Sequence, residues 1–181
     1  MERFDRYLEQ YRRPIFSYVV RLLHDEAAAE DIAQETFLRL FNELDRIRDE
    51  TASAWLYRVA RNLVTDYLRK KRPVTFTVLR GQNAGNGGED DDRPGLEFGS
   101  KDLGPEKQSY QTELRKHIDD ALNAMSEKFR DVIVLIDMQK LTHEEAAKVL
   151  GCSVKTVSAR LARAREFFTR RLSKYLSINL G

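Results

Sequence analysis

Apolar and polar residues repeat at steps of three and four along most of this chain, which is the period of an amphipathic α-helix. The first such stretch covers residues 1–23, the second 26–44 and the third 54–72. Pro14 lies inside the first stretch, and we expect it to kink or split that helix. The N-terminal part is therefore predicted to be a small bundle of three helices.

The recurring apolar positions predict the buried face of each helix. They are Phe4, Leu8, Tyr11, Ile15, Tyr18, Val19 and Leu22 in the first, Ile32, Thr36, Phe37, Leu40, Phe41 and Leu44 in the second, and Leu56, Val59, Ala60, Leu63 and Tyr67 in the third. Residues 45–53, DRIRDETAS, have no period and many capping residues. We expect a loop there, with Thr51 or Ser53 capping the third helix.

Residues 73–109 differ from the rest of the chain. They contain three of the four prolines, most of the glycines and the acidic run EDDD, without an apolar period. This composition is typical of a flexible linker.

The C-terminal part again has a helical period, and we expect helices over residues 110–124 and 126–137, with Ser126 capping the second. The stretch LTHEEAAKVLGCSVKTVSARLARAR follows at 141–165. Thr142 and Glu145 have the spacing of a capping box. Gly151 stands where a helix end favours a left-handed residue, and Ser153 can cap the next helix. These signals predict a helix-turn-helix whose last helix continues to about residue 175.

The last helix has two distinct faces. Val154, Val157, Leu161 and Ala164 are expected to face inward, and Lys155, Thr156, Ala159, Arg160 and Arg163 to face outward. The outward groups can reach phosphates and base edges in a major groove. The alternative is an ordinary solvated basic helix, but the spacing of the caps and the glycine favours DNA binding.

The net charge of +2 hides two basic stretches. Residues 153–175 hold seven basic side chains and one acidic one, Glu166, and residues 58–72 hold six against Asp66. The outward face of the third helix also carries an amide, so it can contact both phosphates and a base edge. The alternative is a basic helix that only keeps the domain in solution.

The sequence lacks the patterns of common catalytic and metal sites. It has no Walker loop, no GxGxxG and no zinc-spaced Cys/His set, and we expect His24, His117 and His143 to be scattered and solvated. Cys152 stands alone, so no internal disulfide forms. No apolar run of eighteen residues and no signal-peptide core is present. We therefore expect a cytoplasmic protein that is not an enzyme, with no cofactor, metal or small-molecule substrate.

Three segments resemble a known family. DIAQETFLRLF at 31–41 and AWLYRVARNLVTDYLRKK at 54–71 resemble the second conserved region of bacterial sigma factors, and the helix-turn-helix resembles their fourth region. The order of these blocks is similar to that of the extracytoplasmic function group. One departure is Met125-Ser126, where relatives commonly have Leu-Pro.

The resemblance implies an all-α protein of two small helical domains joined by a flexible linker. Residues 1–72 would be a helical bundle that binds the polymerase clamp and the minus-ten element, 73–109 the linker, and 110–178 a four-helix domain that binds the minus-thirty-five element. The implied partners are core RNA polymerase, through its beta-prime clamp coiled coil and beta flap, promoter DNA, and an anti-sigma factor.

The resemblance also implies roles for individual residues. Polymerase would be bound by Asp31, Gln34, Glu35 and Leu38. The minus-ten element would be held by Arg46, Arg48, Arg58, Arg61, Asn62, Thr65 and Arg69. The minus-thirty-five element would be bound by Ser153, Lys155, Thr156, Ser158, Arg160, Arg163 and Arg165, with Arg171 on a phosphate. Two rivals stay open: a free-standing operator-binding regulator, and an interaction protein that binds no DNA.

Overall fold

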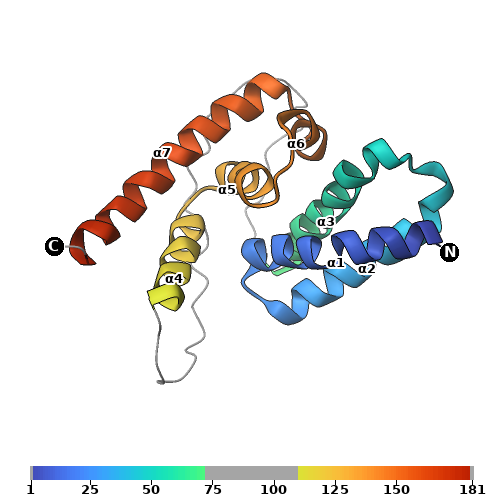
Figure 1. Ribbon diagram of the computed structural model, residues 1–181, viewed down its shortest axis with the longest axis horizontal. Coiled ribbons are helices and arrows are strands. Elements are labelled where there is room, and N and C mark those ends of the chain that lie inside the picture. Colours follow the sequence, from blue (N-terminus) through green and yellow to red (C-terminus); the bar gives the residue numbers. More distant parts are fainter. Residues whose placement is uncertain (1, 72–109, 180–181) are drawn as a thin grey trace, which may run out of the picture.

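A computed structural model of the chain describes residues 2–71 and 110–179, and the side chains of 2–71 and 115–173. Both described segments are entirely helical or connected by short turns, which confirms the predicted all-α fold (Figure 1). The predicted linker at 73–109 lies outside the described residues. The helices are α1 (Glu2–Leu23), α2 (Glu26–Glu43), α3 (Asp49–Lys71), α4 (Tyr110–Asn123), α5 (Glu127–Ile133), α6 (His143–Leu150) and α7 (Val154–Asn179).

The N-terminal helices α1, α2 and α3 pack on one another through their apolar stripes. Ile15, Tyr18, Leu40 and Leu56 are completely buried, and Tyr57 packs edge-on against Tyr18 with 5.4 Å between ring centroids. Asp25 begins α2 by accepting a hydrogen bond from the amide of Ala28 at 3.1 Å. The periodic positions therefore form the core for the reason predicted, since they lie on one side of each helix.

Three local predictions for this part are wrong. The first helix was expected to kink or split at Pro14; it does not split there, because α1 continues through this residue from Glu2 to Leu23. The predicted loop at 45–53 is a 3₁₀ turn (Leu44–Arg46) followed by the start of α3 at Asp49, so Thr51 and Ser53 lie within the helix instead of capping it. Phe41 is 57% exposed and not buried.

The C-terminal helices enclose a second group of apolar residues, among them Leu122, Val132, Leu135 and Leu161. The predicted helix over 126–137 is α5 followed by a π-helical turn, Val134–Met138. Ser126 is at the N-cap position, but its hydroxyl makes no capping hydrogen bond. Phe129 is only half-buried, while Val154, predicted to face inward, is 40% exposed because it begins α7 beyond the edge of the core.

The helix-turn-helix signals are confirmed in detail. The Thr142 hydroxyl accepts from the Glu145 amide at 3.1 Å, and the Glu145 carboxylate accepts from the Thr142 amide at 2.8 Å, which completes the capping box. Gly151 has a φ of 64°, the left-handed conformation that ends α6. The Ser153 hydroxyl accepts from the amide of Thr156 at 3.1 Å and so caps α7.

Replacing Thr142 by alanine tests how much the capping box contributes. The amide of Glu145 loses its partner at the start of α6, so we expect a loss of about 1 kcal/mol of unfolding free energy. The measurement is urea unfolding followed by far-UV circular dichroism. Ser173→Ala is the matched control, since that hydroxyl only bonds to a carbonyl within α7; equal midpoints for the two variants would contradict the assignment.

The two halves are in contact and share one continuous apolar core. Helix α6 lies against α3, and the π-helical turn after α5 lies against α1 (Figure 1). Polar pairs that cross the seam include Arg61 with Asp131, Tyr57 with Gln139, and Arg21 with Asp119. In this structure the protein is therefore closed, with the N-terminal and C-terminal helices packed together.

Candidate polymerase and promoter surfaces

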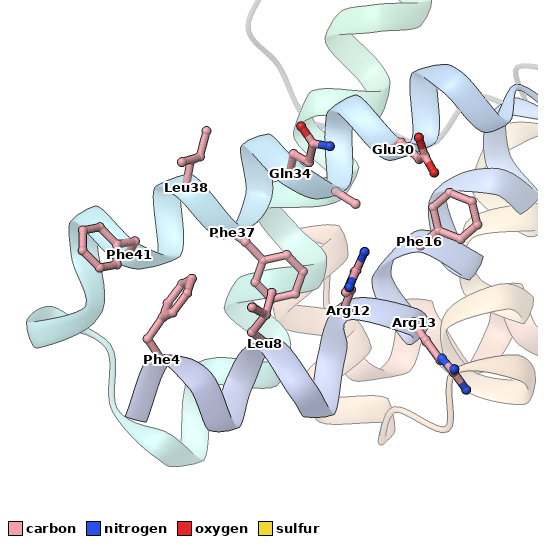
Figure 2. A pocket seen from close by; sticks show the side chains of 11 residues that line it. Phe4, Leu8, Arg12, Arg13, Phe16, Glu30, Gln34, Phe37, Leu38 and Phe41 are labelled. Carbon is pink, nitrogen blue, oxygen red and sulfur yellow. The ribbon is translucent and has the colours of Figure 1, made fainter. Parts of the chain in front are cut away.

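A groove of about 1060 Å³ runs between α1 and α2. Figure 2 shows Phe4, Leu8 and Phe37 between the two helices, while Leu38 points away from α1. Leu38 is 60% exposed and Phe41 57% exposed, and the Phe41 ring stands edge-on to Phe4 with 5.4 Å between centroids. Large apolar side chains exposed along one groove mark a surface that another molecule covers.

Polar residues of α2 line the same side of the molecule. Asp31 and Gln34 are exposed, and Glu35 is half-exposed and pairs with Arg39 on the next turn at 2.7 Å. With Leu38 they form the face on which sequence reasoning placed the polymerase. Sequence reasoning missed the apolar half of this surface, because it assigned Phe4, Leu8 and Phe41 to the core.

The turn between α2 and α3 is tied to α1 by a polar cluster that the sequence did not reveal. Asp49 accepts from Arg3 at 2.9 Å, from Arg6 at 2.6 Å and from the Tyr7 hydroxyl. Arg3 also donates to the carbonyls of Leu44 and Ile47. The hydrogen bonds from Tyr7 and Arg3, with the charges of Arg3 and Arg6, lower the pKa of Asp49. The cluster fixes the turn that carries the exposed side chains of Arg46 and Arg48.

The outward face of α3 carries the residues predicted for the minus-ten element. Arg58, Asn62, Thr65 and Arg69 are exposed, and Arg69 forms a surface ion pair with Asp66 at 3.0 Å. These side chains line one side of the helix, as their spacing requires. Arg61 differs from them because its side chain is only 26% exposed.

Arg61 points into the seam between the two halves. Its Nε donates to Oδ2 of Asp131 at 2.7 Å, and the Asp131 side chain is 2% exposed. Burial raises the pKa of Asp131, and the charge and hydrogen bond of Arg61 oppose that shift. Close by, the Tyr57 hydroxyl donates to Oε1 of Gln139 at 3.0 Å. A residue of the proposed DNA surface is thus engaged by the protein itself.

The first turns of α7 present the predicted recognition face. Ser153, Lys155 and Ser158 are exposed, and Thr156 and Arg160 are half-exposed. Among the described residues, neither Lys155 nor Arg160 has an ion-pair partner. The face is therefore accessible, and it combines cations with hydroxyls as base-edge and phosphate contacts require.

Two further residues predicted to bind the minus-thirty-five element, Arg163 and Arg165, follow Arg160 along α7. Arg163 is exposed. Arg165 instead donates from Nε and Nη2 to the Asp137 carboxylate at 2.9 and 2.5 Å. This pair raises the pKa of Arg165 and ties α7 to the π-helical turn. The structure thus gives Arg165 a positioning contact that its sequence position did not indicate.

The histidines and acidic residues that the structure describes do not form a metal site. No group of three His, Cys, Asp or Glu is placed to hold a metal ion within these residues. His24, expected to be solvated, is half-buried after α1, and its Nε2 is buried without a hydrogen-bond partner among them. Burial lowers the pKa of His24. None of the described helices has the length and apolar character needed to cross a membrane.

Two family models match the two halves. The model of Sigma-70 region 2 matches residues 7–74, and that of Sigma-70 region 4 matches residues 115–168. The apolar groove and basic α3 fall in the first match and the helix-turn-helix in the second. Fold and surfaces together define a two-region transcription factor of the sigma type.

Relatives give the narrower assignment. The chain is 33% identical over 167 residues to the ECF RNA polymerase sigma factor SigW of Bacillus subtilis, covering 90% of this chain and 84% of that protein. It is 30% identical over 177 residues to the RNA polymerase sigma-H factor of Pseudomonas aeruginosa, covering 96% and 88%. The chain belongs to the extracytoplasmic function (ECF) group of RNA polymerase sigma factors. It spans 64% of another relative, SigE of Mycolicibacterium smegmatis, at 29% identity.

Solved structures share the fold. The sigma factor RpoE of Bartonella quintana, crystallised with the anti-sigma factor NepR, matches with a TM-score of 0.69 at 24% identity, over 96% of this chain and 98% of that chain. CnrH in complex with the cytosolic domain of CnrY matches with a TM-score of 0.66 at 23% identity, over 94% and 88%. The helical arrangement is thus one that the sigma factor RpoE and CnrH also adopt.

Proposed function

We propose that the groove between α1 and α2, together with the polar face of α2, binds core RNA polymerase through its beta-prime clamp coiled coil. The observation that supports this most directly is the exposure of Leu38 and Phe41 beside the groove. An amphipathic helix that lays its apolar side in the groove would cover both side chains. Asp31 and Glu35 then lie at the rim, where charges steer association more than they add affinity.

In this proposal the turn after α2 and the outward face of α3 hold the minus-ten element. Arginines at exposed helix positions contact phosphates whatever the sequence, and Asn62 offers an amide for a base edge. Melting exposes unstacked bases, which a pocket on the protein can favour over the paired state. The Asp49 cluster supports this role, since it holds the turn with Arg46 and Arg48 in place.

The first turns of α7 read the minus-thirty-five element in the major groove. Lys155, Thr156, Arg160 and Arg163 are assigned to reading the element, with Ser153, Arg165 and Arg171 on phosphates and Ser158 beside them. Neither half needs to bind DNA tightly alone. Tethering both to one polymerase raises their effective concentration on a single duplex. The protein would act in the cytoplasm as a non-catalytic subunit, and an anti-sigma factor is a further partner suggested by the complexes of its structural relatives.

Transcription in vitro tests this function. The full chain is mixed with core polymerase and a pool of random promoter fragments, and the RNA products are sequenced. We expect defined start sites that share upstream elements and that are absent with core polymerase alone. A chain that neither joins core polymerase nor starts RNA synthesis on any fragment would refute the proposal. A footprint by the chain alone would instead support the operator-binding rival.

A further inference from the structure

A second cavity, of about 280 Å³, lies between the C-terminal end of α1 and helix α4 (Figure 1). Its walls are Phe16, Ser17, Val20, Arg21 and His24 from α1 and the turn after it, and Arg115, Ile118 and Asp119 from α4. Apart from Phe16, which also lines the groove, none of these residues belongs to the surfaces assigned to polymerase or promoter. The volume is just below the range of sites for drug-sized ligands, so the cavity suits a smaller molecule.

The polar part of this wall is cationic on balance. Arg21 and Arg115 each bring a guanidinium, and the one carboxylate, Asp119, already lies 3.5 Å from Arg21. Arg115 is exposed and forms no ion pair with a described residue. Burial lowers the pKa of His24, and the charges of Arg130 and Arg21 add to that effect, which places both guanidiniums near the imidazole. A concave site with this balance of charge attracts a small anion.

Buried nitrogens beside the cavity lack hydrogen-bond partners. They are Nε2 of His24 and both Nε and Nη1 of Arg130, and the described residues offer none of them an acceptor or donor. Arg130 is only 6% exposed. Buried polar atoms in folded proteins nearly always have a partner, which can be a bound water or ion. An anion in the cavity would offset part of the cost of burying the Arg130 charge.

The backbone at His24 gives an independent sign that this side chain has a role. His24 follows the last residue of α1 with a φ of 52°, in the left-handed region. Glycine is the usual residue at this position of a helix end, because it adopts that conformation without a steric cost. The chain instead places an imidazole there, and local strain of this kind is typical of ligand sites.

We propose that this cavity binds a small molecule that carries a phosphate group. The guanidiniums of Arg21 and Arg115 donate to the phosphate oxygens. Phe16, Val20 and Ile118 contact the short carbon part. Phosphate fits better than carboxylate, because a tetrahedral dianion can accept from two guanidiniums on different helices at once. The site does not depend on the polymerase and promoter assignments, so either can fail without the other.

Calorimetric titration of the full chain with glycerol 3-phosphate, inorganic phosphate and acetate tests the site. We expect one saturable site per chain for both phosphates and none for acetate. Arg115→Gln should raise the Kd for glycerol 3-phosphate by about ten- to a hundredfold, as the loss of a charge-assisted hydrogen bond does. Arg115→Lys keeps the charge and should lose less. Lys148→Gln is the control, because it removes one positive charge from an exposed position of α6 outside the cavity.

Thermal unfolding gives a second readout. Glycerol 3-phosphate should raise the unfolding midpoint of the wild-type chain and of the control, but not of Arg115→Gln, because a ligand stabilises only the form that binds it. An absence of heat with both phosphates at millimolar concentration would mean that water alone serves the buried nitrogens, and would overturn the proposal. Equal Kd values for Arg115→Gln and Lys148→Gln would place the anion elsewhere, and binding of acetate as tight as phosphate would overturn the ligand class.

Discussion

Replacing Leu38 by aspartate is expected to weaken binding to core RNA polymerase by about 30- to 1,000-fold, equivalent to about 2–4 kcal/mol, as at a central interface residue. Leu38 is 60% exposed in the free protein, so the change leaves the core of the N-terminal bundle intact. In the complex, however, it would bury a carboxylate among apolar groups without a partner. Titration of fluorescent chain with core polymerase measures the effect.

Gln10→Asp is the matched control, because it places the same charge on an exposed position of the same bundle that does not line the groove. Reversing the charges of Asp31 and Glu35 should cost less than the change at Leu38. Both lie at the rim, and Glu35 already has Arg39 as a partner at 2.7 Å. Equal affinity of Leu38→Asp and Gln10→Asp for core polymerase would remove the groove from the interface.

Helices and their caps could be predicted because their causes are local. The capping box of Thr142 with Glu145 and the left-handed Gly151 depend on residues within one turn, and both were found where the spacing placed them. The start of α3 was missed because the contacts that hold it come from residues distant in the sequence. Asp49 begins that helix while held by Arg3, Arg6 and Tyr7, which are more than forty positions earlier in the chain.

The periodic pattern could not distinguish a core residue from one at an interface. Phe41 has the same apolar character and spacing as Leu40, yet Leu40 is fully buried and Phe41 is 57% exposed. An amphipathic stripe is equally apolar whether its cover comes from the same chain or from another molecule. The spacing of Asp31, Gln34, Glu35 and Leu38 indicated a separate face of α2, but composition alone favoured a solvated surface, and only resemblance to a family gave that face a partner.

The sequence left open whether the two halves pack together in the free protein, and it did not identify the residues of the seam. Asp131 and Arg130 look like ordinary solvated positions of a short helix, but they are 2% and 6% exposed because the N-terminal half covers them. Arg61 was selected as a DNA contact from its place on α3, with no sign that Asp131, seventy positions later, would engage it. Such contacts depend on how two segments that are distant in the sequence lie relative to each other. The repeat of apolar residues within one helix does not specify that arrangement.

Arg160→Ala should change base preference at one position of the minus-thirty-five element. A bidentate contact from an arginine to a guanine edge discriminates by about 1–3 kcal/mol, or about 5- to 150-fold. Arg160 suits this role because it is half-exposed in the first turns of α7 and has no ion-pair partner among the described residues. Promoter selection with the polymerase complex, followed by sequencing, would show relaxed preference at one base pair.

Arg165 provides the contrast that makes this prediction specific. Its guanidinium is held by both carboxylate oxygens of Asp137, so it cannot donate the same two groups to a base edge. Arg165→Ala should therefore weaken binding to all promoters alike and leave the preferred sequence unchanged, as loss of a phosphate or positioning contact does. If Arg165→Ala altered the selected sequence and Arg160→Ala did not, the reading face would lie farther along α7 than its first turns.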